Sequence, residues 1–309
     1  MGSTAVVRQQ LRSGSDTVTE IVHWNPRVHT RLSRRMPGPL SPLLHRKVRN
    51  FGDLLGPIIV HRILENRSLT NPPTEQRLLT VGSILHMART GDVVWGSGRN
   101  GKIGEEHHRF EDLDVRSVRG PLTAQWLDSR GIKAPRTFGD PAILIPQLFP
   151  ELAAPELAAP ELAAAKRESS GPITFVPNLN DVDFGTLPDG VDHLDPRENP
   201  YTIMRRLARS RFVIASSLHA IIIAEAFGVE ARLVRTVNEH EFKYADHYLG
   251  TGRADFRMAD TVAQALRLGG EPPMQLDPAP LLAVFPDDLF VRGDMRRGFR
   301  RRSFPSPVH

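Results

Sequence analysis

The sequence predicts an α/β protein with two similar lobes, and two observations support this prediction. Short apolar runs rich in β-branched residues alternate with longer apolar or amphipathic segments, as in parallel strands joined by crossover helices. This pattern occurs over residues 20–150 and again over residues 171–270. A chain of 309 residues is long enough for each lobe to bury its own hydrophobic core.

The clearest strand–helix–strand unit begins with residues 212–215, an apolar run typical of a buried parallel strand. Residues 218–227 are predicted to form a helix that is apolar on nearly all sides. Ser216 and Ser217 separate the two elements, and either hydroxyl could cap the helix. His219 lies in the first helical turn, at the carboxyl end of a strand, where open α/β sheets bind ligands. We therefore favour a site role for His219 over the alternative of a buried core histidine.

The first lobe is expected to contain four strands that end in polar or glycine-rich turns. These strands are residues 20–24, 78–83, 92–95 and 115–120, with helices at 54–64, 84–88 and 122–129. Asn50 or Asp53 could cap the first helix, and Gly52 would let the backbone approach a ligand closely. Ser97 and Gly98 belong to a turn whose N–H groups could bind an anion, although many loops share this pattern.

The second lobe repeats the arrangement after a low-complexity segment. Its expected strands are residues 173–178, 191–195, 212–215 and 231–234, with helices at 199–209, 218–227 and 260–268. The repeated ELAAP sequence indicates a spacer, so residues 151–170 are predicted to be a linker. Residues 27–49 are predicted to be a long loop. Residues 271–309 would hold an amphipathic segment, at 279–289, and a basic tail.

Composition excludes several classes of chemistry and favours a cytoplasmic location. The chain has no cysteine, which rules out disulfides, thiolate metal sites and a cysteine nucleophile. It has no apolar signal segment and no apolar run long enough to span a bilayer. The net charge is +5, and arginines are concentrated at residues 292–302. This tail is either a solvated end or a contact with an anionic membrane surface or saccharide, and no motif indicates nucleic-acid binding.

Six segments in order resemble the polysaccharide pyruvyl transferase family. They are NFGDLLGPIIV at 50–60, VVWGSGRNGK at 93–102, SVRGPLTAQWL at 117–127, FGDPAILIP at 138–146, FVIASSLHAIIIAEAFGV at 212–229 and FKYADHYLGTG at 242–252. The resemblance covers most of residues 20–290. It implies two Rossmann-like lobes of the glycosyltransferase-B type with the active site in the cleft between them. It also implies phosphoenolpyruvate as donor and a saccharide or lipid-linked oligosaccharide as acceptor, with pyruvate transferred as a ketal.

The chain departs from the family at one informative position. Family members commonly have Arg-Leu-His where this sequence has Ser217, Leu218 and His219. The positive charge for the donor must then come from elsewhere, and Arg119, Lys243 and Arg99 are candidates. Arg119 lies at a strand-to-helix corner, where it could clamp a phosphate or pair with a surface carboxylate.

The resemblance and the residue pattern together predict a site that needs no metal and no cofactor. Its catalytic residues would be His219, Asp53 and Arg119. Donor binding would use Ser216, Ser217, Leu218, His219, Arg119, Lys243, Ser97 and Gly98, and acceptor binding Asn50, Asp53 and Arg99. Two alternatives stay open: a glycosyltransferase that uses a nucleotide sugar, and a saccharide-binding relative without catalysis. Peripheral contact with the inner membrane face through the basic tail is a further expectation.

Overall fold

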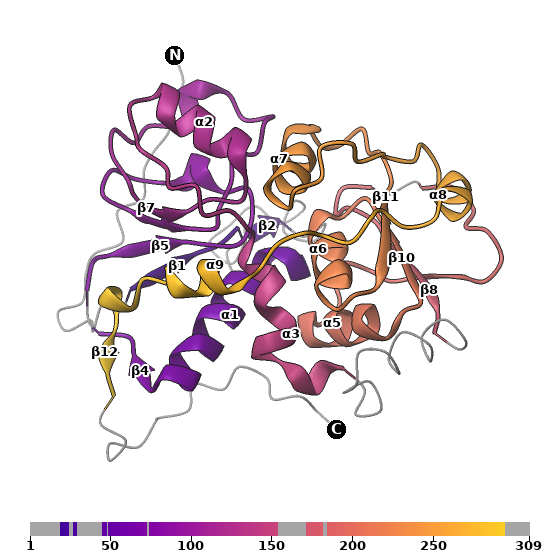
Figure 1. Cartoon of the computed structure of the whole chain (residues 1–309), viewed down its shortest axis with the longest axis horizontal. Helices are drawn as coiled ribbons and strands as arrows, with labels where there is room; N and C mark the ends of the chain where they lie inside the picture. Colours follow the sequence, from indigo (N-terminus) through magenta and orange to yellow (C-terminus); the bar gives the residue numbers. More distant parts are fainter. Residues whose placement is uncertain are drawn as a thin grey trace.

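The computed structural model describes residues 19–24, 27–29, 45–47, 49–72, 74–153, 171–181 and 184–293. Two four-stranded parallel sheets lie side by side, one in each half of the chain (Figure 1). This confirms the predicted α/β class with parallel sheets, which is consistent with a Rossmann-like architecture. Most of the predicted linker, from residue 154 to residue 170, and the basic tail from residue 294 lie outside the described residues.

The sheet of the first half has the strand order β1-β5-β6-β7, so its strands are adjacent in the same order in which they follow along the chain. Its strands are β1 (Glu20–Val22), β5 (Arg77–Leu79), β6 (Val93–Trp95) and β7 (Asp114–Ser117). Helices α1 (Phe51–Arg67) and α2 (Pro121–Ser129) connect or follow these strands, with short 3-10 helices at Leu85–Met87 and Glu105–His107. Pro121 begins α2 as expected, because the first helical position needs no N–H donor.

The sheet of the second half has the order β11-β10-β8-β9, and its strand order reverses between β8 and β10. Its strands are β8 (Ile173–Val176), β9 (Val191–His193), β10 (Phe212–Ala215) and β11 (Glu230–Leu233). Its helices are α5 (Pro200–Arg209), α6 (Leu218–Ala226), α7 (Phe242–Gly250) and α8 (Val262–Leu268). The reversal matters because open α/β sheets bind ligands at the carboxyl ends of the strands where the order changes.

A core of buried apolar side chains runs through both halves, so they are packed against each other. Segments between the sheets contribute to it: 3-10 helices Pro141–Leu144 and Pro150–Leu152, and α3 (Ile145–Leu148). Helix α6 is buried on most sides and packs against Pro141–Leu144 and α5, which explains its continuous apolar sequence. The carboxyl end of β10 is thereby held next to the first turn of α1.

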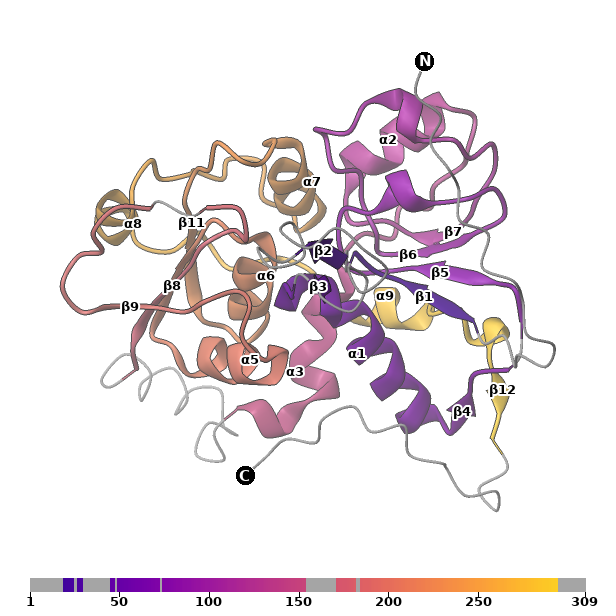
Figure 2. The same cartoon turned by 180° about the vertical axis from the view of Figure 1, so that it is seen from behind.

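The C-terminal segment returns to the first half (Figure 2). Strand β12 (Val291–Arg292) pairs antiparallel with β4 (Leu69–Thr70), and Trp95 Nε1 donates to the Leu281 carbonyl in α9 (Ala279–Ala283) at 2.9 Å. A 3-10 helix, Asp287–Leu289, lies between α9 and β12. The amphipathic segment at 279–289, for which the sequence left either lobe open, therefore packs on the first sheet.

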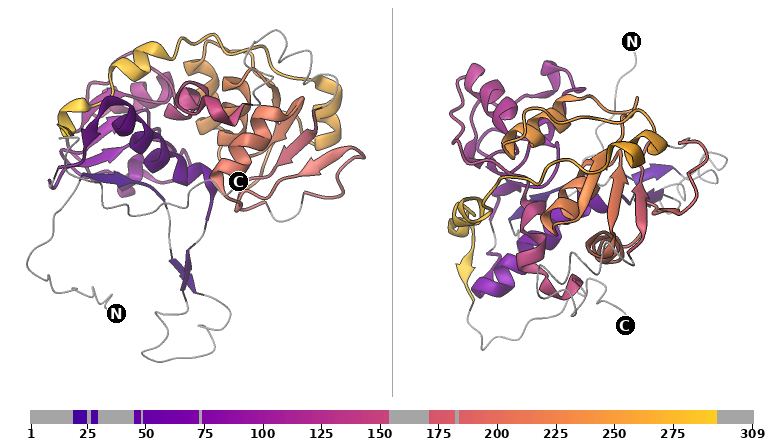
Figure 3. Two further views of the ribbon diagram at one scale, coloured as in Figure 1. Left: turned by 90° about the horizontal axis from the view of Figure 1, so that it is seen from below. Right: turned by 45° about the vertical axis from the view of Figure 1, so that its right-hand side comes forward.

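Several element boundaries differ from the sequence predictions. Helix α1 begins at Phe51 instead of residue 54, and the predicted helix at 84–88 is only a 3-10 turn. The predicted loop at 27–49 contains an antiparallel pair, β2 (Arg27–His29) and β3 (His45–Lys47), which projects from the body (Figure 3). Helix α7 was not predicted, because its buried face carries lysine, aspartate and histidine side chains that hide the apolar periodicity.

The two halves are joined by a buried ion pair between Arg119, after β7, and Asp246 in α7. Arg119 Nε lies 3.0 Å from Asp246 Oδ2, and both side chains are fully buried. Thr123 donates to the same carboxylate from its backbone N–H and from its hydroxyl, at 2.9 and 2.7 Å. A Cβ on Gly120 would lie 1.8 Å from the Asp246 carbonyl oxygen, so α2 and α7 approach closely only because this residue is glycine.

We expect Asp246→Asn to destabilise the protein by about 3–5 kcal/mol, because it leaves the Arg119 guanidinium buried without a counter-charge. The matched control is Asp287→Asn, which removes one partner of a half-exposed ion pair with Arg67 at 2.6 Å. This control should change the free energy of unfolding by less than about 1 kcal/mol. Urea denaturation of both variants measures the difference. Equal stabilities would show that the buried pair contributes nothing to holding the halves together.

Candidate functional site

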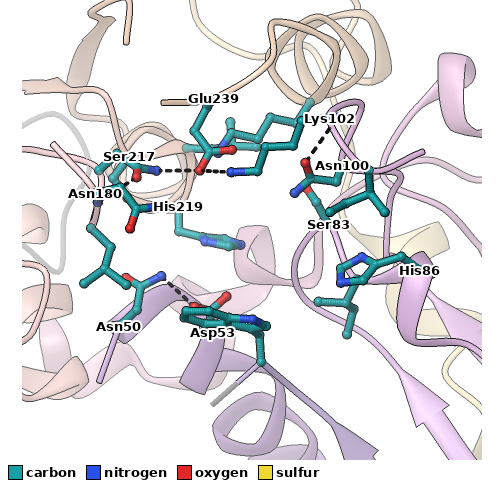
Figure 4. A pocket seen from close by; sticks show the side chains of 17 residues that line it. Asn50, Asp53, Ser83, His86, Asn100, Lys102, Asn180, Ser217, His219 and Glu239 are labelled. Atoms are coloured by element: carbon teal, nitrogen blue, oxygen red, sulfur yellow. Dashed lines mark hydrogen bonds and ion pairs between the residues drawn. The ribbon is translucent and has the colours of Figure 1, made fainter. Parts of the chain in front are cut away.

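A pocket of about 220 Å³ lies where the carboxyl ends of both sheets and the first turn of α1 meet. Figure 4 shows the side chains that line it. From the first half these are Trp24, Asn50, Asp53, Ser83, Ile84, His86, Asn100, Lys102 and Ile103. From the second half they are Asn178, Leu179, Asn180, Ser217, Leu218, His219, Glu239 and Lys243. Six of the predicted site residues are therefore brought together: Asn50, Asp53, Ser217, Leu218, His219 and Lys243.

His219 lines the pocket from the first turn of α6, and its side chain is 13% exposed. Its Nε2 lies 3.5 Å from Oδ2 of Asp140, whose own side chain is fully buried. The other Asp140 oxygen accepts from the Ala142 N–H at 3.0 Å. Burial opposes ionisation of Asp140, but the neighbouring His219 and the N–H bond hold the pKa of this carboxyl below its usual value. A carboxylate in this position can orient the imidazole and stabilise its protonated form.

Gly52 in the first turn of α1 allows the imidazole to occupy this place. A Cβ on Gly52 would lie 2.2 Å from His219 Nδ1, so any larger residue would displace the ring. The sequence prediction for Gly52 was close approach of a ligand to the backbone. In the structure the group that approaches Gly52 is the His219 side chain from the other half of the chain, and close approach of a ligand stays a prediction.

Asp53 and Asn50 lie at the beginning of α1. Asn50 Nδ2 donates to Asp53 Oδ2 at 2.7 Å, and Asn50 makes no side-chain cap bond to the helix backbone. Burial raises the pKa of Asp53, although His219 and the Asn50 amide oppose the shift. A carboxylate with a raised pKa in a pocket is a candidate general base, and Asn50 orients it.

Two lysines supply the positive charge of the pocket. Lys102 Nζ lies 3.0 Å from Glu239 Oε1, and Lys243 Nζ lies 3.2 Å from Glu239 Oε2. Burial lowers the pKa of Lys243, and the adjacent Glu239 carboxylate partly compensates. The chain thus has cationic groups in the pocket where Ser217 cannot provide one.

The two serines before α6 have different surroundings. Ser217 lines the pocket and its side chain makes no cap bond. The Ser216 hydroxyl accepts from the Asn178 N–H at 2.8 Å and donates to Asp181 Oδ2 at 2.5 Å, so it ties the end of β10 to the loop after β8. Ser216 therefore supports the wall of the pocket and does not line it.

The predicted anion clamp at Arg119 is not supported by the geometry. Besides its bond to Asp246, the guanidinium donates to the Ser83 hydroxyl and to the Arg99 carbonyl, and its side chain is fully buried. Ser97 and Gly98 do not line the pocket either, and Ser97 Oγ and Gly98 N both donate to the Gly82 carbonyl. A strand-to-helix corner can hold a ligand, but at the corner of Arg119 the Asp246 carboxylate from the second half of the chain takes that place.

Arg99 also points away from the pocket. Its Nη2 lies 2.5 Å from Glu105 Oε1, and its guanidinium lies over the rings of Trp126 and Phe242 at 5.0 and 5.5 Å. The predicted role of Arg99 in acceptor binding is therefore not supported either. Among the predicted basic residues, Lys243 alone lines the pocket.

Sequence reasoning missed Asp140, Lys102, Asn178 and Glu239. Asp140 lies in the segment FGDP, for which the sequence predicts no site residue, and Lys102 ends the segment VVWGSGRNGK, in which Ser97, Gly98 and Arg99 are the predicted site residues instead. Asn178 is the last residue of the expected strand 173–178, and β8 ends two residues before it at Val176, so its place at a strand's carboxyl end could have indicated it. Glu239 lies in the polar turn after β11, and nothing in its local sequence distinguishes it.

Two further observations concern the described residues. Within this part of the chain, no group of three or more histidine, aspartate or glutamate side chains is arranged to hold a metal ion. None of the described helices is long and apolar enough to cross a membrane.

The structure is an α/β protein whose pocket is lined by His219, Asp53 and two lysines, and comparison with known proteins indicates a family. Residues 105–236, which include Asp140, Asn178 and His219, match the polysaccharide pyruvyl transferase family. The succinoglycan biosynthesis protein ExoV of Rhizobium meliloti (strain 1021) is 30% identical over 207 residues. The aligned region is 64% of this chain and 60% of that protein. No solved structure shows significant similarity.

The match over residues 105–236 and the similarity to ExoV both support the polysaccharide pyruvyl transferase family that the six motifs indicate. It spans about 60% of the length of the curated relative that it matches. The matched family region ends before Glu239 and Lys243 and begins after Asp53 and Lys102, so these pocket residues come from outside it.

We expect Asp53→Asn to increase the free energy of unfolding at pH 7, because the wild-type protein keeps an ionised carboxylate buried. The pKa of Asp53 is raised in the folded state above its ordinary value of 3.8. As the pH falls, the folded protein therefore binds a proton at Asp53 before the unfolded chain does. The wild type thus gains stability relative to the variant over this pH range. Urea denaturation of both proteins between pH 7 and pH 4 measures this. A variant that is less stable at pH 7 would contradict the burial argument.

Proposed function

We propose that this protein transfers pyruvate from phosphoenolpyruvate, as a ketal, to a sugar of a surface polysaccharide or of its lipid-linked precursor. The observation that carries the proposal is the pocket itself, in which His219 and Asp53 lie beside two lysines. Phosphoenolpyruvate carries a phosphate and a carboxylate, so its site needs cationic groups and N–H donors. The match to the pyruvyl transferase family and the similarity to a protein named for succinoglycan biosynthesis support the same reaction.

The size of the pocket favours a small donor over a nucleotide sugar. Pockets that enclose drug-sized ligands usually measure about 300–1,000 Å³, whereas this pocket measures about 220 Å³. A three-carbon phosphate ester suits the smaller volume. The acceptor sugar would then approach from the open side of the pocket.

The reaction requires a proton donor and a base. The methylene carbon of phosphoenolpyruvate takes a proton, a sugar hydroxyl oxygen bonds to the neighbouring carbon, and the bond from that carbon to the phosphate oxygen breaks. A second sugar hydroxyl closes the ketal ring. Of the two hydroxyl protons that are lost, one balances the new methyl group and the other leaves with inorganic phosphate.

In this proposal His219 transfers the proton to the methylene carbon, since an imidazole can exchange protons near neutral pH. Asp140 holds the ring from behind, and Asp53, oriented by Asn50, accepts the proton of the acceptor hydroxyl. The first turn of α6, from Leu218, adds backbone N–H groups for the donor, whereas the Ser217 N–H donates to the Val176 carbonyl. No step uses Arg119.

We also propose that the two parallel sheets are the lobes of a glycosyltransferase-B type fold. The location of the pocket at the carboxyl ends of both sheets supports this assignment. The first half, with Asn50 and Asp53, would be the acceptor side, and the second half the donor side. Contact of the basic tail with an anionic membrane surface stays part of the proposal, because the acceptor is expected to be lipid-linked.

His219→Ala should lower the rate of ketal formation at least about 100-fold, because it removes the proton donor. The assay incubates the protein with phosphoenolpyruvate and candidate acceptor glycans and detects by mass spectrometry the addition of pyruvate minus water. Calorimetry with phosphoenolpyruvate and a panel of nucleotide sugars runs in parallel. Turnover close to that of the wild type would remove His219 from the mechanism, and selective binding of a nucleotide sugar would replace the proposed donor.

Asp140→Asn should lower kcat by about 10–100-fold with little change in the KM for donor, because it acts only through His219. The asparagine can still accept from the Ala142 N–H, so the local turn is kept. Steady-state kinetics with varied phosphoenolpyruvate measure both constants. A change confined to KM would show that Asp140 influences donor binding instead of positioning the imidazole.

A further inference from the structure

The carboxylate of Glu239 lies between two ammonium groups that come from different halves of the chain. Lys102 follows β6 in the first half, and Lys243 lies in the first turn of α7 in the second half. Their Nζ atoms are 3.0 and 3.2 Å from the two Glu239 oxygens, and Asn178 Nδ2 donates to Oε1 at 3.4 Å. The four side chains all line the pocket, and Figure 4 labels Glu239 and Lys102 among them.

The Glu239 side chain is only 7% exposed, although it belongs to an exposed segment. Its neighbours Val237, Asn238 and His240 in the turn between β11 and α7 are exposed, and Val237 is 99% exposed. The carboxylate therefore reaches inward from a surface turn. Such a side chain can leave the pocket without disturbing either sheet.

Electrostatics explain why an anion lies at this position. Two ammonium groups in a partly buried pocket repel each other, and burial already disfavours the charged form of Lys243. The Glu239 carboxylate between them offsets part of this penalty. Any anion of similar size could do the same, and the phosphate of the proposed donor carries more charge than a carboxylate.

We propose that Glu239 is an internal counter-ion that occupies an anion subsite formed by Lys102 and Lys243, and that the phosphate group of the donor replaces it on binding. The identity of the donor rests on the proposed function, but the subsite itself does not. The exchange keeps the two lysines neutralised in both states. It also provides the charge that Ser217 does not supply, and it assists product release because the carboxylate can return as phosphate leaves.

The test measures binding of inorganic phosphate, a probe that requires no pyruvyl chemistry, by calorimetry at fixed ionic strength. Glu239→Gln is nearly isosteric and removes the competing charge, so it should bind phosphate about tenfold more tightly than the wild type, a gain of about 1.4 kcal/mol. Lys102→Met and Lys243→Met should each weaken phosphate binding about tenfold or more. Adding Lys243→Met to Glu239→Gln should abolish the gain.

Glu151→Gln is the matched control, because Glu151 forms an exposed ion pair with Arg62 at 2.5 Å, away from the pocket. It should leave phosphate binding unchanged. Glu239→Asp serves as a second variant that keeps the charge, and it should not produce the gain. Thermal unfolding of every variant checks that the fold is intact.

Weaker or unchanged phosphate binding by Glu239→Gln would overturn the proposal, since it would show that the carboxylate only holds the lysines in place. Pyruvate is the second probe: a gain for pyruvate but not for phosphate would overturn the assignment of the subsite to phosphate. Failure of the proposed function gives a different result. In that case Glu239→Gln still binds phosphate more tightly than the wild type, but no acceptor receives pyruvate from phosphoenolpyruvate.

Discussion

The contact between Arg119 and Asp246 is the constraint on which the rest of the site depends. This fully buried ion pair connects the first half of the chain to α7 of the second half. Thr123 adds two hydrogen bonds to the Asp246 carboxylate. A buried pair of this kind adds little net stability by itself, but loss of one partner is costly, so it fixes the relative position of the halves. Lys243 lies one turn before Asp246 in the same helix, which links its place in the pocket to this contact.

The pocket results from the way parallel strands end. The strand order reverses between β8 and β10, and the carboxyl ends of these strands carry Asn178 and the start of α6. The first turn of α1 approaches from the other half, and Gly52 leaves room for the His219 ring. Both halves thus contribute ionisable side chains, and neither half forms the pocket alone.

The pocket accepts unfavourable burial of charge at several positions. The raised pKa of Asp53 and the lowered pKa of Lys243 both reflect desolvation that a purely structural site would avoid. Perturbed ionisable groups that converge on one pocket are typical of functional sites. The internal carboxylate of Glu239 reduces the penalty at the lysines, and this arrangement suits a family member in which Ser217 replaces the usual arginine.

The sequence by itself determined the α/β class, the strands of both parallel sheets and the family resemblance, and it singled out His219, Asp53 and Asn50, which line one pocket. It could do so because apolar periodicity, helix-start residues and motif order are local properties. Only the tertiary structure decided which polar side chains meet. It placed Arg119 in the contact between the halves, brought Asp140 to the imidazole, and set Lys102 and Glu239 beside Lys243. These pairings join residues far apart in the chain, and charge complementarity between such residues leaves no periodic signal in the sequence.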